Sequence, residues 1–370
     1  MKKVLFVSHV ANFIKFNAPF MKWFQDNGWV VHYASLGEEA LINCDKSFNV
    51  CFNRKVFHPD NIKAYFQIKK IIEQENYDII HCHTPIGGAL TRFAARKSRK
   101  NGTKVIYTAH GFAFWKGAPQ KDWMIYYNAE KFLSKYTDTL ILINNEDYNI
   151  AKEKKFHAKH IFKINGVGVD TAKFTVSSSE NRKIKRKALG LPENTFLILY
   201  AAEFIPRKNH IFLLHNLKSL LAEGLDIHCA LLGTGKLFDE IKEKSNELKI
   251  NNNVHFFGYR RDAQEFYAAA DLIVAPGNQE GLPVHILEGM ASGLPIVATK
   301  IRGHIDLITN ERNGLLFNLN NSEEFCSAIK RIMNDSYLRN NIMQSNIEDV
   351  KKFNIENAII SMAEIYKTMM

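Results

Sequence analysis

The sequence predicts an α/β protein with two successive domains, each built on a parallel sheet that helices cover on both faces. Three observations support this prediction. Short apolar runs alternate with longer helical patterns, which is typical of βαβ units. The alternation stops over residues 166–194 and then resumes. The chain also has 370 residues, more than a single hydrophobic core normally serves.

The first half of the chain, residues 1–165, alternates apolar runs with helical patterns and predicts one Rossmann-like domain. Its apolar runs are short and rich in Val, Ile and Leu, so each predicts a buried strand. The predicted strands are Val4–Val7, Val30–Ser35, Ile79–Cys82, Val105–Thr108 and Thr139–Ile143. The predicted helices between them are Pro19–Asn27, Ile62–Gln74, Gly88–Lys100 and Trp123–Ser134.

Residues 166–194 are rich in Gly, Ser, Lys and Glu and lack a sustained apolar period, so they predict a linker. Residues 195–354 then predict a second Rossmann-like domain, with a helix over Ile211–Ala222. Its predicted strands are Phe196–Ala201, Ile227–Leu232, Val254–Phe257, Leu272–Ala275, Pro295–Ala298 and Gly314–Phe317. A final helix, about residues 355–370, is expected to pack back on the first domain. In two such sheets ligands bind at the carboxyl ends of the strands, so we expect the site in a cleft between the domains.

The net charge of +11 lies entirely in the first half of the chain. Residues 1–165 hold 25 Lys and Arg against 14 Asp and Glu, whereas residues 166–370 hold 24 of each sign. This excess fits nucleic acid, an anionic membrane or phosphorylated ligands. No nucleic-acid motif accompanies it, so we expect no nucleic-acid partner. The cluster after the Gly87-Gly88 turn suits the anionic inner leaflet of a membrane, and its members are Arg92, Arg96, Lys97, Arg99, Lys100 and Lys104.

The cysteines and the start of the chain indicate a cytoplasmic protein. Five scattered cysteines include no CxxC pair, which argues against a disulfide framework or a zinc site. His81-Cys82-His83 alternates along a predicted strand, so its three side chains do not easily chelate one ion. The basic start is followed by an apolar stretch that Ser8-His9 interrupts, which favours a strand over a signal peptide. No stretch approaches the ~20 apolar residues that span a bilayer.

The densest candidate for a site is the segment Pro276–Ala291, which follows a predicted strand. Gly281 suits a tight turn that begins a helix, whose first N–H groups bind anions or hydroxyls. Glu280 lies in that turn and Glu288 on the helix. Carboxylates accept paired hydrogen bonds from neighbouring hydroxyls, so the pattern suits a polyhydroxylated ligand. A capped amphipathic helix with a solvated glutamate is the alternative interpretation.

Three weaker candidates also follow predicted strands. Gly233-Thr234-Gly235 would let the backbone approach a phosphate, although a lone GxG is weak evidence and favours a simple turn over a site. Arg207-Lys208 would neutralise a diphosphate, unless these are only solvated loop charges. His110 would orient a hydroxyl or stabilise developing charge, with a pKa near working pH, unless it is a structural histidine. The aromatic segment through Phe114, Trp115, Lys116 and Trp123 to Tyr127 suits a groove for sugars or lipid headgroups, or a helix core.

Taken together and in order, these segments resemble the retaining glycosyltransferases of family 4, which have the GT-B fold of two facing Rossmann-like domains. The resemblance covers nearly the whole chain and is strongest to the bacterial branch that builds capsular, exopolysaccharide or antigen repeat units on polyprenyl diphosphate. The residues that carry it are Thr108–Gly111, Ile164–Asp170, Lys208–His210, Leu232–Gly235, Phe257–Arg260, Ala270-Asp271, the pair Glu280 and Glu288, Gly293–Ala298 and Asn313–Leu315.

The resemblance implies a nucleotide-sugar donor, with UDP as the nucleotide, and a glycan acceptor linked to polyprenyl diphosphate. It implies transfer of a hexose or N-acetylhexosamine with retained configuration, by front-face attack, without a metal or other cofactor. Lys208, Glu280 and His110 would be catalytic. The residues that would contact the donor are Lys208, Arg207, Gly233, Gly235, Tyr259, Arg260, Glu280, Gly281, Leu282 and Glu288. Those on the acceptor and membrane side would be His83, Phe112, Trp115, Arg92, Arg96 and Lys100.

Two positions depart from the family pattern. Many members have an arginine five residues before the lysine, where this chain has Glu203. A carboxylate beside a diphosphate is repulsive, so we expect Glu203 to point away or to pair with Arg207 or Lys208, and Arg207 to compensate. The second departure is Gly289, where alanine is common.

Three other functions are compatible with parts of the sequence. A non-hydrolysing nucleotide-sugar epimerase would use the same fold. A nicotinamide-dependent oxidoreductase is disfavoured because no glycine follows the first strand. A non-catalytic nucleotide-sugar-binding subunit stays open because of Glu203. The sequence indicates no oligomeric state.

Overall fold

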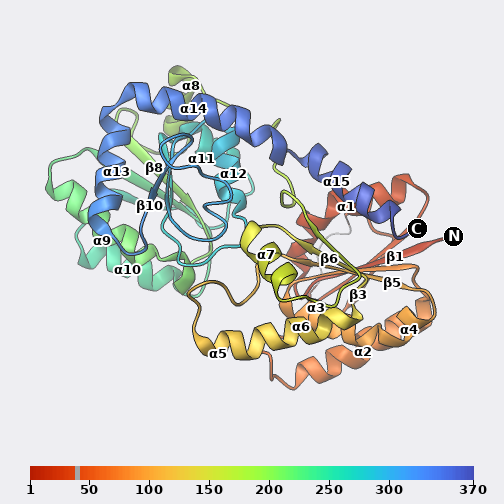
Figure 1. Cartoon of the computed structure of the whole chain (residues 1–370). Helices are drawn as coiled ribbons and strands as arrows, with labels where there is room; N and C mark the ends of the chain where they lie inside the picture. Colours follow the sequence, from red (N-terminus) through yellow and green to blue (C-terminus); the bar gives the residue numbers. More distant parts are fainter. Residues whose placement is uncertain (38–41) are drawn as a thin grey trace. The chain divides into compact units, whose positions relative to one another are not determined.

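The computed structural model describes residues 1–37 and 42–370 and divides them into two compact units (Figure 1). The first unit comprises Met1–Gly168 together with Ile355–Met370, and the second comprises Val169–Asn354. Each unit is built on one parallel sheet flanked by helices. The predicted fold class, two successive parallel α/β domains, is therefore confirmed.

The first unit contains a seven-stranded sheet in the order β3-β2-β1-β4-β5-β6-β7. Its strands are β1 (Lys3–Val7), β2 (Val30–Ser35), β3 (Lys46–Asn49), β4 (Ile79–His83), β5 (Lys104–Ala109), β6 (Thr139–Leu142) and β7 (His160–Lys163). The order reverses at β1, which pairs with both β2 and β4, with Val4 opposite Val31 and Ile79. Such a reversal places the carboxyl ends of neighbouring strands around a potential binding site.

Helices cover this sheet, and most of them coincide with predicted ones. They are α1 (Ile14–Asp26), α2 (Asp60–Glu75), α3 (Pro85–Ala94), α4 (Arg96–Lys100), α5 (Gln120–Asp122), α6 (Asn128–Leu133), α7 (Asn145–Glu153) and α15 (Ile355–Lys367), with a π-helical turn at Trp123–Tyr127. The prediction that the first helix begins at Pro19 is wrong, because α1 begins at Ile14 and contains this proline. Strands β3 and β7 were not predicted, since both carry exposed polar residues where buried strands carry apolar ones.

The carboxyl-terminal helix α15 belongs to the first unit. Its Tyr366 is fully buried, and the Tyr366 hydroxyl lies 2.8 Å from His81 Nδ1 on β4. The Tyr366 ring packs against Phe24 of α1 at a centroid distance of 4.6 Å. No helix within residues 1–37 and 42–370 combines the length and apolar character that a membrane crossing requires.

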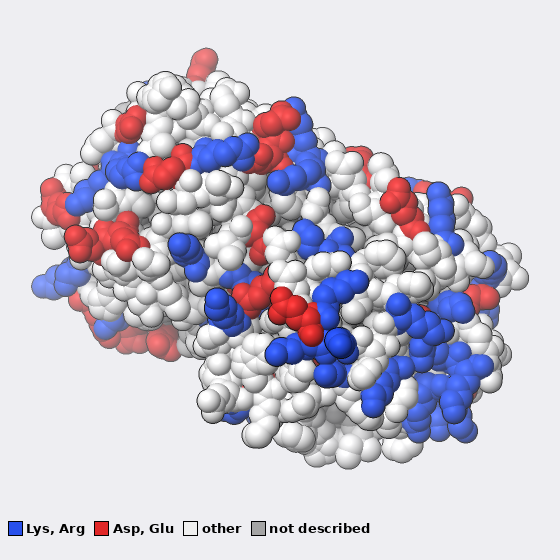
Figure 2. Space-filling view, in the orientation of Figure 1, with Lys and Arg blue, Asp and Glu red and all other residues white. Residues whose placement is uncertain are grey.

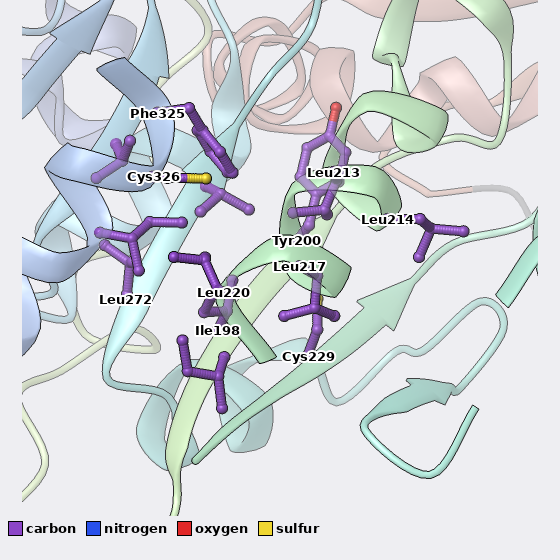
Figure 3. Packing of buried hydrophobic residues seen from close by; sticks show 14 of the residues in the cluster. Ile198, Tyr200, Leu213, Leu214, Leu217, Leu220, Cys229, Leu272, Phe325 and Cys326 are labelled. Carbon is purple, nitrogen blue, oxygen red and sulfur yellow. The ribbon is translucent and has the colours of Figure 1, made fainter. Parts of the chain in front are cut away.

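The second unit contains a six-stranded sheet in the order β10-β9-β8-β11-β12-β13. Its strands are β8 (Phe196–Ala201), β9 (Ile227–Leu232), β10 (Val254–Phe256), β11 (Leu272–Ala275), β12 (Ile296–Thr299) and β13 (Leu315–Phe317). Its helices are α8 (Ser179–Ala188), α9 (His210–Ala222), α10 (Phe238–Glu247), α11 (Ala263–Ala269), α12 (Val284–Ala291), α13 (Ser322–Asn334) and α14 (Ser336–Val350). Figure 3 shows the core between α9 and the sheet, where Leu213, Leu217 and Leu220 share one buried cluster with Ile198 and Cys229.

The predicted linker, residues 166–194, is wrong for most of its length. It contains α8, which Ser178 caps by accepting a hydrogen bond from the Asn181 N–H, and the second unit begins at Val169. The buried residue of α8 is Arg186, whose Nε donates to the Ala269 carbonyl at 2.8 Å and whose Nη2 pairs with Asp271. A charged residue forms this buried contact, so the segment lacks the apolar period by which helices are recognised in sequence.

Candidate functional site

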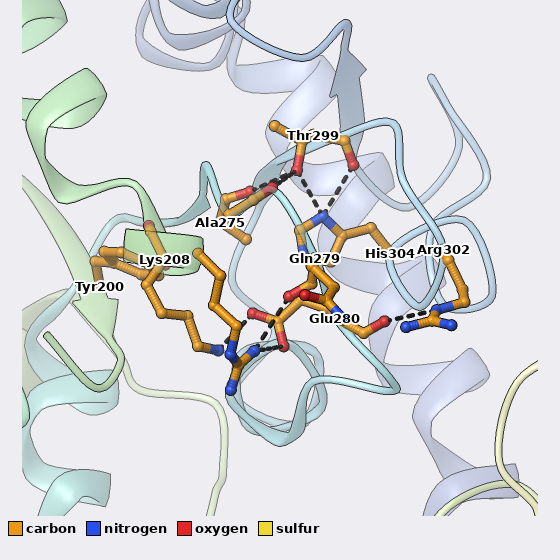
Figure 4. Close-up of polar contacts among 10 residues, drawn as sticks. Tyr200, Lys208, Ala275, Gln279, Glu280, Thr299, Arg302 and His304 are labelled. Carbon is orange, nitrogen blue, oxygen red and sulfur yellow. Dashed lines mark hydrogen bonds and ion pairs between the residues drawn. The ribbon is translucent and has the colours of Figure 1, made fainter. Parts of the chain in front are cut away.

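The centre of the candidate site in the second unit is a buried carboxylate that meets two cations. Lys208 lies in the turn after β8, and Glu280 lies in the loop after β11. The Lys208 ammonium forms an ion pair with Glu280 Oε1, and both residues are more than nine-tenths buried (Figure 4). Arg207 Nη1 lies 3.3 Å from Glu280 Oε2. The Asn278 N–H donates to the Arg207 carbonyl at 2.7 Å, which joins the two loops directly.

The charges around Glu280 determine its protonation state. Burial alone would raise the pKa of this carboxyl, but the charges of Lys208 and Arg207 outweigh burial and lower the pKa to about 2. Glu280 is therefore ionised at neutral pH. A buried ion pair contributes little net stability because both charges lose their hydration. Strongly shifted groups of this kind concentrate at functional sites.

The backbone on both sides of the ion pair is fixed from the interior. The Tyr200 hydroxyl donates to the Lys208 carbonyl at 2.8 Å, and Arg302 Nε donates to the Glu280 carbonyl at 3.0 Å. Thr299 Oγ1 lies 2.6 Å from the Gly277 carbonyl, and His304 Nδ1 lies 2.9 Å from the Thr299 carbonyl (Figure 4). These contacts orient the two charged side chains before a ligand arrives.

Sequence reasoning missed Arg302 and His304. Both follow the strand β12 and are buried, with exposed fractions of 5% and 0%. The signal for them is an Arg-Gly-His segment that begins four residues after the predicted strand Pro295–Ala298, at the sheet edge that also holds Lys208 and Glu280. Gly303 has to be glycine, because its φ is +82° and a Cβ there would lie 2.6 Å from the Gly281 carbonyl oxygen.

Two neutral histidines lie close to Glu280. Burial, together with the charge of Lys208, lowers the pKa of His285 to about 3, and burial lowers the pKa of His304 to about 4. Their Nε2 atoms are buried and meet no hydrogen-bond partner among the described residues. Neutral imidazole nitrogens add hydrogen-bonding capacity to the site without adding charge.

Glu288 on α12 is positioned by a tyrosine. The Tyr267 hydroxyl donates to Glu288 Oε2 at 2.7 Å, and Tyr267 itself is buried. Gly281 and Leu282 are half-buried in the turn before α12, and no described side chain caps this helix at Pro283. The unusual Gly289 has a structural explanation, because a Cβ there would lie 2.7 Å from Ile273 Cγ1.

The glycines of the Gly233-Thr234-Gly235 turn serve close packing between two loops. Gly233 has φ +129°, and a Cβ there would lie 2.1 Å from the Ala202 carbonyl oxygen. Gly235 has φ +155°, and its Cβ would lie 2.5 Å from the Phe204 carbonyl oxygen. The Gly233 N–H donates to the Gly258 carbonyl at 2.7 Å, so it is already used within the protein. Diphosphate binding at this turn stays a prediction, and the structure explains both glycines without it.

The predicted base-binding residues lie at the surface beyond β10. Tyr259 is 61% exposed. Arg260 Nη2 pairs with Asp262 Oδ2 at 2.6 Å, and its guanidinium lies 5.2 Å from the centre of the Phe266 ring. The structure thus brings Lys208, Arg207 and Glu280 into direct contact, whereas the prediction that Tyr259 and Arg260 line a base pocket stays a prediction.

In the first unit, His83 and His110 meet at the carboxyl ends of β4 and β5. His83 Nδ1 lies 3.1 Å from His110 Nε2, and the Phe13 ring packs edge-on against His110. Burial lowers the pKa of His110 to about 4 and that of His83 well below its usual value. The expectation that His110 titrates near working pH is therefore wrong, and both rings are neutral there. Among the described residues no three His, Cys, Asp or Glu side chains are grouped as metal ligands would be.

Two residues that were expected on the acceptor and membrane side are part of the core. Arg92 is 1% exposed, pairs with Glu130 at 2.8 Å and lies 3.8 Å above the centre of the Tyr107 ring. Phe112 is 2% exposed and stacks on Phe114. Neither is available to a membrane surface.

Of the other four residues of that set, His83 is also buried, at 2% exposed, and three are accessible. Trp115 and Arg96 are half-buried and Lys100 is exposed. These three therefore remain candidates for contact with an acceptor or a membrane.

Comparisons with known proteins cover the same two units. The family described as glycosyl transferases group 1 matches residues 181–349, and the family described as glycosyl transferase 4-like matches residues 3–145. EpsD of Bacillus subtilis (strain 168), named a glycosyltransferase, is 38% identical over 100% of this chain and 97% of its own length. A UDP-Gal:alpha-D-GlcNAc-diphosphoundecaprenol alpha-1,3-galactosyltransferase of Escherichia coli is 30% identical over 84% of this chain and 80% of its own length.

Solved structures share the fold at lower identity. The Anabaena protein Alr3699/HepE, crystallised with UDP and glucose, aligns with a TM-score of 0.83 at 19% identity and covers 99% of this chain and 100% of its own. WaaG, a glycosyltransferase involved in lipopolysaccharide biosynthesis, aligns with a TM-score of 0.78 at 17% identity over 98% of this chain and 99% of its own. With two parallel-sheet units and these matches, the chain belongs to the group 1, family-4-like glycosyltransferases and has the GT-B fold.

Proposed function

We propose that this glycosyltransferase moves a sugar from a UDP-sugar to a glycan acceptor linked to a polyprenyl diphosphate, during synthesis of a bacterial surface polysaccharide. The observation that carries the proposal is the buried site in which Lys208 and Arg207 meet the ionised Glu280. The name of the Escherichia coli relative, which specifies UDP-galactose and a diphosphoundecaprenol acceptor, supports the donor and acceptor classes. The structures of HepE with UDP support the nucleotide.

The proposed reaction breaks the bond between the sugar C1 and the donor phosphate oxygen. The electron pair leaves with UDP, and an acceptor hydroxyl oxygen bonds to C1 and gives its proton to a phosphate oxygen of the leaving group. The main electrostatic task is to stabilise charge on the departing diphosphate. Lys208 and Arg207 supply cations for this task, and the uncapped first N–H groups of α12 supply further donors. We propose that these protein groups suffice without a metal ion.

The two glutamates take the hydroxyl groups of the donor in this proposal. Glu280 is ionised and accepts hydrogen bonds only, so it suits the hydroxyls of the transferred sugar. Glu288, oriented by Tyr267, suits the paired ribose hydroxyls. Arg302 supports the site through the Glu280 backbone.

The acceptor is assigned to the first unit. His110 is neutral and therefore suits the orientation of an acceptor hydroxyl by hydrogen bonding rather than by charge. We propose that the protein acts at the cytoplasmic face of the membrane, because its proposed acceptor is lipid-linked and its proposed donor is a UDP-sugar. We also propose retention of configuration. UDP-galactose carries an α-linked sugar, and the linkage in the name of the Escherichia coli relative is also α.

The test is release of UDP from a panel of UDP-sugars, with and without a polyprenyl-diphosphate glycan. We expect release that depends on the acceptor. Lys208→Ala is expected to lower kcat/KM about 10³-fold, the scale on which removal of a charge-stabilising donor acts. Lys218→Ala, an exposed lysine on α9, is the matched control and should leave transfer unchanged.

Three outcomes would contradict the proposal. Full activity of a folded Lys208→Ala variant would show that Lys208 does not stabilise the leaving diphosphate. Formation of an isomeric UDP-sugar without acceptor would indicate an epimerase. Donor binding without any turnover would indicate a non-catalytic binding subunit.

A further inference from the structure

Five aromatic rings form a continuous row on the surface of the first unit. The row runs Phe66, Tyr65, Phe93, Tyr136 and Phe132, and successive ring centroids lie 5.2, 5.7, 5.8 and 5.7 Å apart. These residues come from α2, α3, α6 and the turn after α6, so the fold and not the local sequence brings them together. We refer to them as the aromatic row.

Three of the five rings of the aromatic row, all phenylalanines, are exposed, whereas Tyr65 and Tyr136 are half-buried. Phe66 is 60% exposed, Phe132 48% and Phe93 36%. Ile62, one helical turn before Phe66 on α2, is 65% exposed. Single exposed apolar residues need no explanation, but contiguous exposed apolar residues indicate a surface that binds a membrane or another protein.

Basic side chains flank the aromatic row. The Arg96 guanidinium lies 4.3 Å from the centre of the Phe93 ring, and its Nη1 donates to the Tyr65 hydroxyl at 2.8 Å. The Lys135 ammonium lies 5.8 Å from the centre of the Phe132 ring. Figure 2 shows Lys and Arg gathered over the part of this unit where α4 lies in Figure 1, with few acidic residues among them.

Exposed aromatic rings flanked by cations indicate that an anionic lipid bilayer covers this surface. Peripheral proteins bind the interface of an anionic bilayer by inserting apolar rings towards the acyl chains. Their cations then lie at the level of the lipid phosphates. A second copy of this chain is a poorer occupant. A two-fold contact places the same surface on both sides, and would set these cations against each other.

We propose that the aromatic row inserts into the headgroup region of an anionic leaflet while Arg96 and Lys135 contact the lipid phosphates. The docking of the first unit then brings it to the lipid-linked acceptor, and only this consequence rests on the proposed function. The contact surface shares Arg96 with the basic cluster seen in the sequence, but two other members of that cluster are not available to it. Arg92 is buried, and Arg99 pairs with Asp138 at 2.9 Å.

The first experiment measures partitioning of the full chain onto vesicles of phosphatidylglycerol and phosphatidylethanolamine. Phe66→Ser combined with Phe132→Ser is expected to weaken partitioning about tenfold or more, because two inserted rings are lost. Arg96→Gln and Lys135→Gln are each expected to weaken it about fivefold, and only on anionic vesicles. Tyr337→Ser, a 76% exposed aromatic residue of α14, is the matched control and should have no effect.

The second experiment reports insertion directly and does not depend on loss of function. The tryptophan introduced by Phe66→Trp is expected to fluoresce, and brominated acyl chains should quench this fluorescence. The tryptophan introduced by Tyr337→Trp should fluoresce without being quenched. Thermal unfolding of each variant checks that the fold is retained. Unchanged partitioning of the Phe66→Ser, Phe132→Ser variant, or an unquenched Trp at position 66, would overturn the proposal. So would a wild-type dimer that the double variant dissociates, because a second copy would then cover the aromatic row.

A third comparison separates this proposal from the proposed function. The double serine variant should transfer sugar to a short-chain, water-soluble diphosphate acceptor within about twofold of wild type. Its transfer to a vesicle-embedded acceptor should fall in parallel with partitioning. If the wild type transfers sugar to neither acceptor but still binds vesicles through the aromatic row, the proposed function is wrong. The proposal that the aromatic row binds membranes is then still supported.

Discussion

At the scale of single residues, the carboxylate of Glu280 meets two cations from one loop. Glu203, five residues before Lys208, is a carboxylate at a position where the family resemblance implies arginine. The candidate site instead draws its positive charge from Lys208 and Arg207, both in contact with Glu280, and Arg302 holds the Glu280 backbone. A bound diphosphate would compete with Glu280 for these cations. Because two cations meet one carboxylate, these three side chains together carry one excess positive charge before a ligand binds.

Tyr267 provides a test at this scale, because its hydroxyl lies 2.7 Å from Glu288 Oε2 and 3.1 Å from the His285 carbonyl oxygen. Tyr267→Phe removes a hydrogen bond to a charged group, which typically contributes ~1.5–3 kcal/mol. If Glu288 holds the ribose in both the ground state and the transition state, the KM for the donor should rise about tenfold with little change in kcat. Donor-saturation kinetics at fixed acceptor measure this. Tyr337→Phe is the control, and a fall in kcat at constant KM would assign Tyr267 a different role.

At the scale of elements, loops after neighbouring strands pack closely enough to exclude side chains. The turn at Gly233 contacts the segment after β8, where the Phe204 N–H donates to the Thr234 carbonyl at 2.9 Å. That segment leads directly to Arg207 and Lys208. The position of the two cations thus depends on Gly233 and Gly235, which follow them by 25 to 28 residues in the chain.

Gly233→Ala tests this dependence. A Cβ 2.1 Å from the Ala202 carbonyl oxygen, at φ +129°, requires the loops to separate, and we expect the free energy of unfolding to fall by about 3 kcal/mol. Gly224→Ala is a matched control, because Gly224 also has positive φ, +84°, but open space around its Cβ position. Its expected loss is about 1 kcal/mol. Urea unfolding measures both, and equal losses would show that crowding at Gly233 is unimportant.

At the scale of the whole molecule, both units bury histidines in the neutral state. Burial lowers the pKa of His81 to about 3 in the first unit, and lowers those of His285 and His304 to about 3 and about 4 in the second. Each protonates less readily in the folded chain than in the unfolded chain, where the value is near 6.5. The folded protein therefore loses stability as pH falls.

The expected pH dependence follows from these shifts. Between about pH 6.5 and 4 the unfolded state binds more protons, so the free energy of unfolding should fall by about 1.4 kcal/mol per pH unit for each such histidine. In most of this pH window Glu280 does not contribute to the pH dependence of the free energy of unfolding. Its lowered pKa contributes stability above about pH 4.5 that is lost only as pH falls towards 2. Urea unfolding at several pH values measures the slope.

A matched pair of variants assigns this slope. His304→Asn should reduce the slope of unfolding free energy against pH by the contribution of one histidine. His215→Asn, which replaces an exposed histidine, should leave this slope unchanged. A wild-type stability that stays flat down to pH 4 would contradict the neutral burial of these rings.

The apolar runs of the sequence predict the two parallel sheets and place Lys208, Glu280 and His110 after their strands. Apolar runs report burial locally, and the carboxyl ends of parallel strands in one sheet share one edge. Other features follow from contacts between residues that are distant in the chain. Arg92 is buried because Glu130 and Tyr107 lie around it, the pKa of His110 is low because its strand end is enclosed, and the aromatic row joins three helices. Burial, charge pairing and surface patches all depend on residues distant in the chain, and a local pattern carries no information about them.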